Sequence, residues 1–414
     1  MLRTYLNQAS FPLKMPFNNP LTSGAAVLKC VYYVCKACGL APIAIRSNDG
    51  RKLRFPPFEH SKAGLLYNAV LILIILSMSA AIIQCTFVYR TKAEILKFDG
   101  VIDVTHNTMA SVTAIFVLTV FCIQQRKILE LANRMRVLGE MSQSLCDVEI
   151  CGGRKRLLRD VMMICLTTCC TWLSIFFTTQ VESYKGLLYF SYIYLCNLII
   201  TLTLMQYSIV LRLMQQILRV VNANFHHFST EPSQRKLKVQ IIETSCQGIG
   251  RFTRLRELYL SLSEVAEGFE EFYSQPMLLC IAYIFLTLIF YAHLITKPMV
   301  VGTRSVTNPQ LCHCVFRIMH YVISLITLAK SVSTVITESK KTSKIFNKWL
   351  GTLDSLQLDP KLYLFSNYLL HHSLQFSVFQ LFSLDGSLLM SITASITTYL
   401  VIFLQFQNHQ TTDS

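Results

Sequence analysis

Seven apolar stretches, each roughly 20 residues long, dominate the pattern of hydrophobic and polar positions along this chain of 414 residues. A helix of about 20 apolar residues crosses the ~30 Å hydrocarbon core of a membrane. The pattern therefore predicts an all-α membrane protein with seven transmembrane helices. These helices are expected near residues 64–89, 107–124, 160–180, 187–211, 276–295, 311–330 and 385–406.

The segments between several of these stretches also have a helical pattern. Residues 206–230 continue the fourth stretch with apolar residues three or four positions apart, and residues 234–274 mix charges with periodic Leu, Ile and Tyr. This periodicity predicts helices that extend beyond the membrane. Residues 341–384 carry aromatic and aliphatic side chains with few charges. Such a run needs cover from water, so it either contacts another protein chain or belongs to the core of this one.

The last apolar stretch has one polar face. Hydroxyl side chains recur there at steps of four and three residues, which keeps them on one side of a helix. The row consists of Ser387, Ser391, Ser395 and Thr398, and Ile402 and Gln405 continue it. A polar face on a transmembrane helix either packs closely against another helix or faces water. In the second case this helix is the wall of a pore.

Composition supports the membrane assignment and charge gives the orientation. The chain is 52% hydrophobic and only 15% charged, whereas soluble domains are about 25% charged. Most of its 38 Lys and Arg residues lie in residues 1–63, 125–160, 212–275 and 331–384. Because basic residues collect in cytoplasmic loops, we expect a cytoplasmic N-terminus and an extracellular C-terminus. The same rule explains the net charge of +15 without a nucleic-acid partner.

Several other classes of protein fit the sequence poorly. The predicted orientation is opposite to that of a G-protein-coupled receptor, and the chain lacks Asp-Arg-Tyr after the third stretch. Neither His-Glu-x-x-His nor Gly-x-Ser-x-Gly occurs, so we predict no enzyme. Cys35 and Cys38 have the C-x-x-C spacing, but no second pair lies at zinc-site distance, and we predict neither a metal site nor a cofactor.

Short motifs, mostly near the C-terminus, resemble those of insect gustatory receptors. The sequence TYLVIFLQF at residues 398–406 matches the TYhhhhhQF signature of that family, in which h is a hydrophobic residue. Residues 364–371 resemble the segment before its last helix. Residues 381–385 resemble its Gly-Leu-Phe-x-Ile-Asp element, although Gln380 stands where Gly is usual. Gly-Leu-Ala-Pro at residues 39–42 resembles an N-terminal Gly-Leu-x-Pro element.

The resemblance implies a gustatory receptor that works as a tastant-gated, non-selective cation channel in contact chemosensation. Like insect odorant receptors, it would assemble as a tetramer, either alone or with other gustatory receptor subunits, and would need no G protein. Four copies of the last helix would surround one pore. The resemblance also implies a multi-pass location in the plasma membrane, among membrane lipid, on the dendrites of gustatory receptor neurons.

The single domain would then divide into five parts. They are a cytoplasmic N-terminal segment (1–63), a six-helix ligand-binding bundle with cytoplasmic extensions (64–330), cytoplasmic anchor helices (331–384), the pore helix (385–406) and an extracellular tail (407–414). Carried over by position, Gln405 and Phe406 would form the gate, Tyr399 would pack the pore helix, and Asp385 would lie at its elbow. The predicted pore lining is Ser395, Thr398, Ile402, Gln405 and Phe406.

The outer halves of the first six stretches carry aromatic and polar side chains of the kind that line ligand pockets. The candidate contacts for a small-molecule tastant are Asn107, Ser111, Trp172, Phe176, Tyr192, Tyr291, Phe316, Arg317, His320 and Tyr321. A charge within the membrane is costly and usually functional. Arg317 either pairs with Glu182, contacts the ligand, or extends to the outer surface.

The ligand class follows only from the resemblance. Leu400 follows the Thr-Tyr pair, where sugar receptors of the family usually carry Glu. We therefore expect a bitter or broadly tuned receptor. A fructose-type sugar receptor and an odorant receptor are the alternatives within the superfamily. A secondary transporter is the alternative from another class, although repeated halves and broken spans, which are typical of transporters, do not stand out in this chain.

Overall fold

Helices dominate the computed structural model of the protein, which describes residues 31–45, 57–89, 98–145, 184–230, 241–301, 308–351, 360–372 and 374–412 and four single positions between residues 159 and 169. The helices are α2 (Lys62–Tyr89), α4 (Phe98–Ile123), α5 (Gln125–Ser144), α7 (Tyr184–Thr230), α8 (Ile241–Val301), α9 (Asn308–Leu350), α10 (Pro360–His371) and α11 (Gly386–Thr412). Among the described residues, α2, α4, α7, α8 and α9 are long and apolar enough to cross a membrane, and the Gly386–Ile402 part of α11 is a shorter apolar helix. The all-α membrane class is confirmed. The predicted third span, residues 160–180, lies almost entirely outside the described residues.

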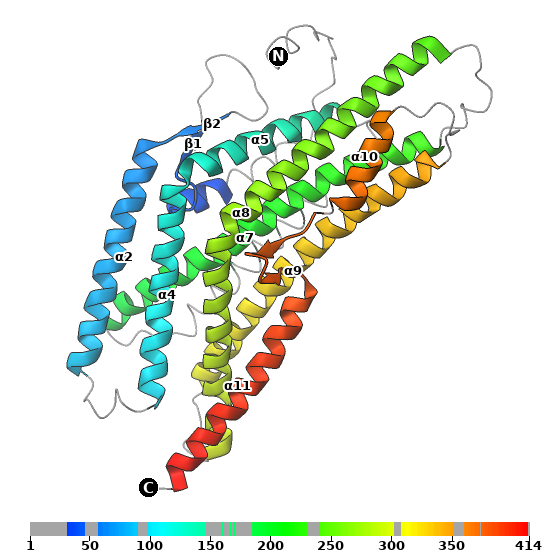
Figure 1. The fold of residues 1–414 in the computed structure, drawn as a ribbon. Helices are drawn as coiled ribbons and strands as arrows, with labels where there is room; N and C mark the ends of the chain where they lie inside the picture. Colours follow the sequence, from blue (N-terminus) through cyan, green and yellow to red (C-terminus); the bar gives the residue numbers. More distant parts are fainter. Residues whose placement is uncertain are drawn as a thin grey trace.

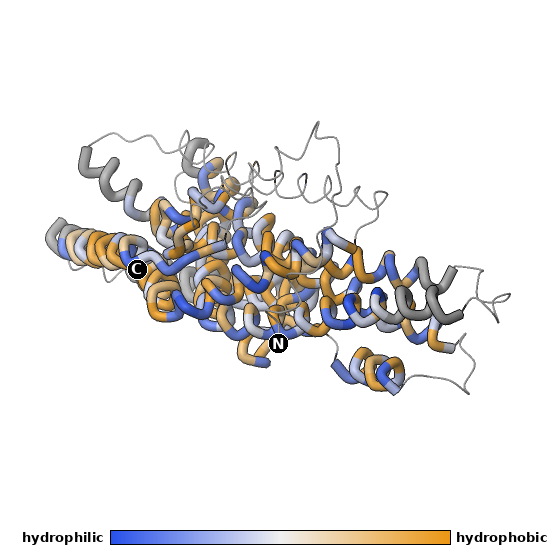
Figure 2. The backbone as a smooth tube through the Cα atoms, turned by 90° about the horizontal axis from the view of Figure 1, so that it is seen from above, coloured by the Kyte–Doolittle hydropathy of each residue, from blue (hydrophilic) through white to orange (hydrophobic). Residues whose placement is uncertain are grey.

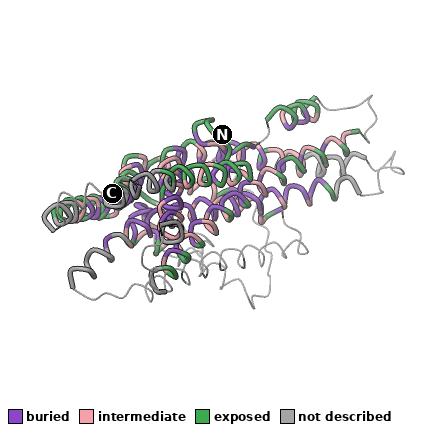
Figure 3. The backbone as a smooth tube through the Cα atoms, turned by 90° about the horizontal axis from the view of Figure 1, so that it is seen from below, coloured by how far each residue is buried: buried purple, intermediate pink, exposed green. Residues whose placement is uncertain are grey.

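Three long helices, α7, α8 and α9, run along the length of the molecule (Figure 1). In the apolar 18-residue stretch of α7, 72% of the residues are buried, whereas in that of α2 only 17% are. A helix that is buried on all sides belongs at the centre of a bundle. Accordingly, the buried residues gather on the central helices in Figure 3, while α2 lies at the periphery with Leu66 and Leu73 exposed.

The two ends of the bundle differ in chemistry. The helices α5 and α10 lie toward one end in Figure 1, and the C-terminus of α11 lies at the other. Basic side chains such as Arg126 and Arg134 on α5 and Lys340 and Lys344 on α9 belong to the first end, where Figure 2 shows hydrophilic residues interspersed with hydrophobic ones. The positive-inside rule predicts that this basic end faces the cytoplasm, and we call it the cytoplasmic end. The predicted continuation of the spans as helices is confirmed for residues 206–230 and for the described part of 234–274, because α7 and α8 are each one unbroken helix.

Aromatic rings from four helices hold the cytoplasmic end together. The ring of Phe346 on α9 lies 5.4 Å from Phe225 on α7, 5.9 Å from Phe252 on α8 and 5.0 Å from Phe365 on α10, measured between ring centroids. Such edge and stacked contacts add to the free energy gained from apolar burial. The aromatic run in residues 341–384 is therefore partly core of this chain. Leu364, at 61% exposure, belongs to the other part, which remains uncovered.

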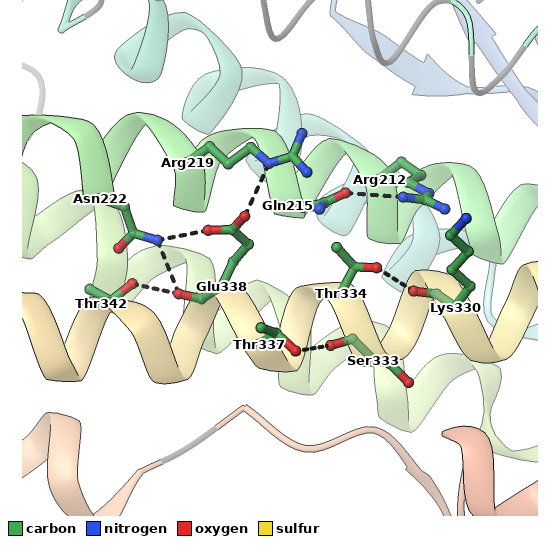
Figure 4. Close-up of polar contacts among 10 residues, drawn as sticks. All are labelled: Arg212, Gln215, Arg219, Asn222, Lys330, Ser333, Thr334, Thr337, Glu338 and Thr342. Carbon is green, nitrogen blue, oxygen red and sulfur yellow. Dashed lines mark hydrogen bonds and ion pairs between the residues drawn. The ribbon is translucent and has the colours of Figure 1, made fainter.

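Polar contacts join α7 and α9 in this cytoplasmic region (Figure 4). Glu338 accepts a hydrogen bond from Arg219 Nε at 3.2 Å, and Asn222 Nδ2 donates to both its carboxylate and its carbonyl oxygen at 3.1 Å. Thr342 Oγ1 donates to the same carbonyl at 3.1 Å. A partly buried charge is tolerated when it is paired and hydrogen-bonded in this way. The contacts fix the position of α9 along α7.

Two small hairpins, which the sequence pattern did not predict, complete the fold. Strand β1 (Ile43–Ile45) pairs antiparallel with β2 (Phe58–His60), and β3 (Ser377–Val378) pairs antiparallel with β4 (Phe382–Ser383). The side-chain amide of Asn133 on α5 holds the first hairpin, because it accepts from the Phe58 backbone N–H at 3.0 Å and donates to the Phe58 carbonyl at 3.1 Å. Helix α5 itself was also not predicted.

Candidate functional site

Helix α11 packs one face against the rest of the chain. Leu388 and Ile392 are buried, and the partly buried Leu389 and Ile396 complete this face. Nearer the far end, the ring of Tyr399 lies 6.0 Å from that of Phe285 on α8. Tyr399, the residue predicted to pack this helix, thus contacts α8.

The rest of α11 is largely exposed, and the polar row is part of this exposed surface. The exposed side chains of the row, at steps of three and four residues, are Ser387, Ser391, Ala394, Thr398, Ile402 and Gln405, and Met390, Thr393, Thr397 and Val401 are exposed beside it. Ser395 is half-buried at the edge of this row, and the side chain of Phe406 lies outside the described residues. The helix therefore brings the predicted Thr398, Ile402 and Gln405 to one uncovered face, which we call the open face of α11.

Hydroxyl groups on the open face donate to their own helix. Ser391 Oγ donates to the Ser387 carbonyl at 3.1 Å, and Thr398 Oγ1 donates to the Ala394 carbonyl at 3.1 Å. A hydroxyl whose proton is used in this way keeps lone pairs on its oxygen as acceptors. A row of acceptor oxygens suits the passage of a cation, and these hydroxyls do not need a partner helix to be satisfied.

Asp385 caps the first turn of α11. Its Oδ1 accepts hydrogen bonds from Ser387 Oγ at 2.6 Å, from the Ser387 backbone N–H at 2.9 Å and from Ser383 Oγ at 3.0 Å. These bonds from Ser387, with a smaller one from Ser383, lower the pKa of Asp385 below its ordinary value. An ionised carboxylate at a helix N-terminus stabilises the helix. Asp385 thus defines where the last helix begins, as the predicted elbow position requires.

A buried polar cluster occupies the region where α4, α7, α8 and α9 meet. At its centre, Asn197 Oδ1 on α7 accepts hydrogen bonds from Tyr283 on α8 at 2.5 Å and from Tyr321 on α9 at 2.6 Å. All three side chains are at most 1% exposed. A buried amide oxygen is costly unless it is hydrogen-bonded, and here it has two donors. The cluster therefore links three helices within the membrane-spanning part.

The hydrogen bonds of the cluster favour one tautomer of His106 on α4. Its Nε2 lies 3.2 Å from both Thr287 Oγ1 and the Tyr283 hydroxyl. Thr287 gives its own proton to the Tyr283 carbonyl at 2.8 Å, and Tyr283 gives its proton to Asn197. With their protons used in this way, both oxygens are available as acceptors, and we assign the hydrogen of the ring to His106 Nε2.

Arg317 lies within this cluster and is only 3% exposed. Its guanidinium carbon is 5.0 Å from the centre of the Tyr194 ring, a cation–π distance. One of the three alternatives from the sequence was that Arg317 extends to the outer surface. The structure does not show this, because so little of the side chain is exposed. Glu182 lies outside the described residues, so the alternatives of pairing and ligand contact stay open.

The other predicted ligand contacts fall into three groups. Tyr291, His320 and Tyr321 lie in or beside the cluster, and Ser111 and Tyr192 contact each other where α4 and α7 meet. Asn107 is half-buried and Phe316 is 37% exposed on the outside of α9. Trp172 and Phe176 lie outside the described residues. The central residue, Asn197, was not predicted, although a single amide inside an apolar stretch is a signal that could have identified it.

The cluster offers hydrogen-bonding groups, aromatic rings and one cation in apolar surroundings, which is the usual composition of a small-molecule site. Within the part of the chain that the structure describes, no group of three His, Cys, Asp or Glu side chains could hold a metal ion. A further set of polar contacts joins α2, α4 and α7, because the hydroxyl of Tyr192 contacts those of Ser79 and Ser111.

Comparison with known proteins places the chain among chemosensory receptors. A family model described as 7tm chemosensory receptor matches residues 28–409. Two Drosophila melanogaster proteins named as gustatory receptors are similar over part of their length. Receptor 28b is 26% identical over 157 residues, and receptor 28a is 27% identical over 156. These alignments span 37% and 35% of this chain and about one third, 33%, of each relative.

The fold matches a solved insect receptor over nearly its whole length. The olfactory receptor OR5 of Machilis hrabei superimposes with a TM-score of 0.66 over 94% of this chain and 100% of that one, at 10% sequence identity. The same receptor in complex with eugenol gives the same score. At this identity the likeness concerns the fold alone.

Proposed function

This chain belongs to the 7tm chemosensory receptor family, and we propose that it is a gustatory receptor whose own helices form a tastant-gated, non-selective cation channel. A receptor of this family is not an enzyme. The observation that carries the proposal is the open face of α11, a row of hydroxyl and amide side chains on an apolar helix. Lipid is a poor partner for such a row, because polar groups in hydrocarbon are costly.

One helix cannot enclose a path for ions, so the proposal requires several copies of α11 around one axis. A homo- or hetero-tetramer with other gustatory receptor subunits supplies four. Exposed apolar side chains at the cytoplasmic end, such as Leu364 and Leu370 at 61% and 62% exposure, favour contacts between subunits there. In such an assembly Gln405 and Phe406 surround the extracellular mouth, and Ile402 forms an apolar ring one turn inward.

The buried polar cluster is the proposed origin of gating. A ligand opens a channel only if it binds the open arrangement better than the closed one. The cluster joins α4, α7, α8 and α9, so a ligand that replaces one of its contacts changes how these helices pack. Its aromatic surroundings favour a hydrophobic, bitter-type compound or a broad range of compounds. The proposed location is the plasma membrane of gustatory neurons.

The test is current in oocytes that express the full chain alone. We expect cation current evoked by at least one compound from a panel of fructose, sucrose, caffeine and quinine, and the current persists when G-protein signalling is blocked. Gln405→Ala is expected to change the relative permeability or the gating of this current. Uptake of a compound without channel-like current would instead favour a transporter, and permeability and gating unaltered by Gln405→Ala would exclude the pore assignment.

A further inference from the structure

The β3–β4 hairpin joins α10 to α11, and a single carboxylate on α8 holds it. Glu270 Oε1 accepts a hydrogen bond from the Ser377 backbone N–H at 2.9 Å and a second from Ser377 Oγ at 2.7 Å. Ser377 is the first residue of β3. Charge-assisted hydrogen bonds are roughly twice as strong as neutral ones. We call this contact between α8 and the hairpin the Glu270 clasp.

From the clasp, hydrogen bonds continue to the first turn of α11. Ser377 lies opposite Ser383 in the β3–β4 ladder. Ser383 Oγ then donates to Asp385 Oδ1 at 3.0 Å. Asp385 Oδ1 also accepts from the Ser387 backbone N–H at 2.9 Å, in the first turn of α11. The beginning of the last helix is therefore connected to α8 through a short path of polar contacts.

The hairpin is packed into the core and internally hydrogen-bonded. Val378 and Leu384 are 0% and 1% exposed, and the Leu384 N–H donates to the Phe376 carbonyl at 3.0 Å. Its turn residues Phe379 and Gln380 have φ angles of +49° and +59°, a conformation that side-chain-bearing residues rarely adopt. Such a turn persists only where the surrounding contacts hold it.

The other end of the same helix enters the buried polar cluster. Tyr283 and Thr287 follow Glu270 on α8 by about four turns, a distance of roughly 20 Å along an unbroken helix. At the level of the cluster, Phe285 contacts Tyr399 of α11. Helix α8 thus contributes to the candidate ligand site, contacts α11 at Tyr399 and holds the hairpin that precedes α11.

We propose that Glu270 is a positioning residue that couples the buried polar cluster to the pore helix, by fixing the β3–β4 hairpin and hence the start of α11 to α8. The inference rests on the proposed channel function. A rigid α8 that shifts at its outer half carries the hairpin with it only while the clasp is made. Without the clasp, the start of α11 no longer follows α8, and the ligand opens the pore less often.

The experiment compares full-length variants in oocytes, with current normalised to the amount of receptor at the cell surface. The probe is whichever of fructose, sucrose, caffeine and quinine opens the wild-type channel. Glu270→Ala is expected to lower the maximal evoked current per surface receptor about tenfold, the scale of losing a hydrogen bond to a charged group in one state. Glu270→Gln retains an acceptor oxygen and is expected to remain within about threefold of wild type.

The matched control is Glu271→Ala. Glu271 is the next residue on α8, is 77% exposed in its side chain and pairs with Lys127, so its removal is expected to leave the normalised current unchanged. A role in folding alone would lower the surface amount without changing the normalised current. Ser377→Ala, which removes one of the two donors, is expected to give an intermediate loss of about threefold.

The outcomes separate the clasp from the channel function. If no probe and no voltage opens the wild-type protein, the proposed channel function fails. If the wild type conducts and Glu270→Ala carries the same normalised current, the proposed coupling role of the Glu270 clasp is wrong. An equal loss in Glu270→Gln and Glu270→Ala would also overturn it, because the acceptor oxygen that Gln retains would then contribute nothing. Should Glu270→Ala not reach the surface, a wild-type current in Ser377→Ala overturns the proposal.

Discussion

At the scale of single residues, the backbone at Gly39 explains why the Gly-Leu-Ala-Pro segment at residues 39–42 begins with glycine. Its φ is +79°, and a Cβ built there would lie 2.7 Å from both Asn68 Oδ1 and Leu118 Cδ2. Asn68 Nδ2 in turn donates to the Gly39 carbonyl at 2.6 Å. The Gly-Leu-Ala-Pro segment therefore turns against α2 and α4 at a point where only glycine fits.

We predict that Gly39→Ala lowers the free energy of unfolding by about 2 kcal/mol or more, because left-handed strain adds to the steric overlap. The matched control is Gly139→Ala in α5, where an added Cβ would meet no atom within 4 Å. That change is expected to stabilise by about 0.5–1 kcal/mol. Thermal unfolding of the detergent-solubilised protein measures both, and equal effects of the two substitutions would contradict this account.

Residue-scale reasoning from sequence found part of the candidate site. The polar row on the last helix was visible because hydroxyls at steps of three and four cannot be separated on a helix. Asn197 was missed because its role depends on Tyr283 and Tyr321. These three residues lie on different helices, and their meeting depends on how those helices pack rather than on local pattern.

At the scale of elements, the long helices followed from the sequence and the short elements did not. Apolar length predicted the spans in α7, α8 and α9, and periodicity predicted that α7 and α8 extend beyond those spans as helices. The strands contain only two or three residues each, too few for an alternating pattern to be seen. Helix α5 was missed because charged residues break up its apolar positions, which pack on α8 through residues such as Leu131.

The β3–β4 hairpin allows a prediction at this scale. Gln380 holds a φ of +59°, which costs a side-chain-bearing residue roughly 1 kcal/mol or more, whereas glycine adopts it freely. Gln380→Gly is therefore expected to leave the thermal midpoint unchanged or raise it. The control is Gln375→Gly, at an exposed position between the buried Leu374 and Phe376, which is expected to cost about 0.5–1 kcal/mol of unfolded-state entropy. A lower midpoint for Gln380→Gly than for Gln375→Gly would contradict the strain.

At the scale of the whole molecule, different kinds of contact hold the cytoplasmic end and the membrane part. The cytoplasmic end is held by aromatic rings around Phe346 and by the Glu338 contacts between α7 and α9. The membrane part contains the buried polar cluster, where His106, Asn197 and Arg317 lie among apolar residues. Helix α11 packs on α8 and α9 at the edge of the bundle. This arrangement leaves its open face available to other copies of the chain.

The central claim is that the open face of α11 lines the path of the ions. Thr398 and Thr393 provide a matched pair, because both are exposed on α11 and both donate to the carbonyl four residues earlier, at 3.1 Å and 2.8 Å. Only Thr398 lies on the open face. The most direct test is the single-channel conductance of Thr398→Val and Thr393→Val in oocyte membranes. The account predicts an altered conductance for Thr398→Val and a wild-type value for Thr393→Val, and a wild-type conductance for Thr398→Val would contradict it.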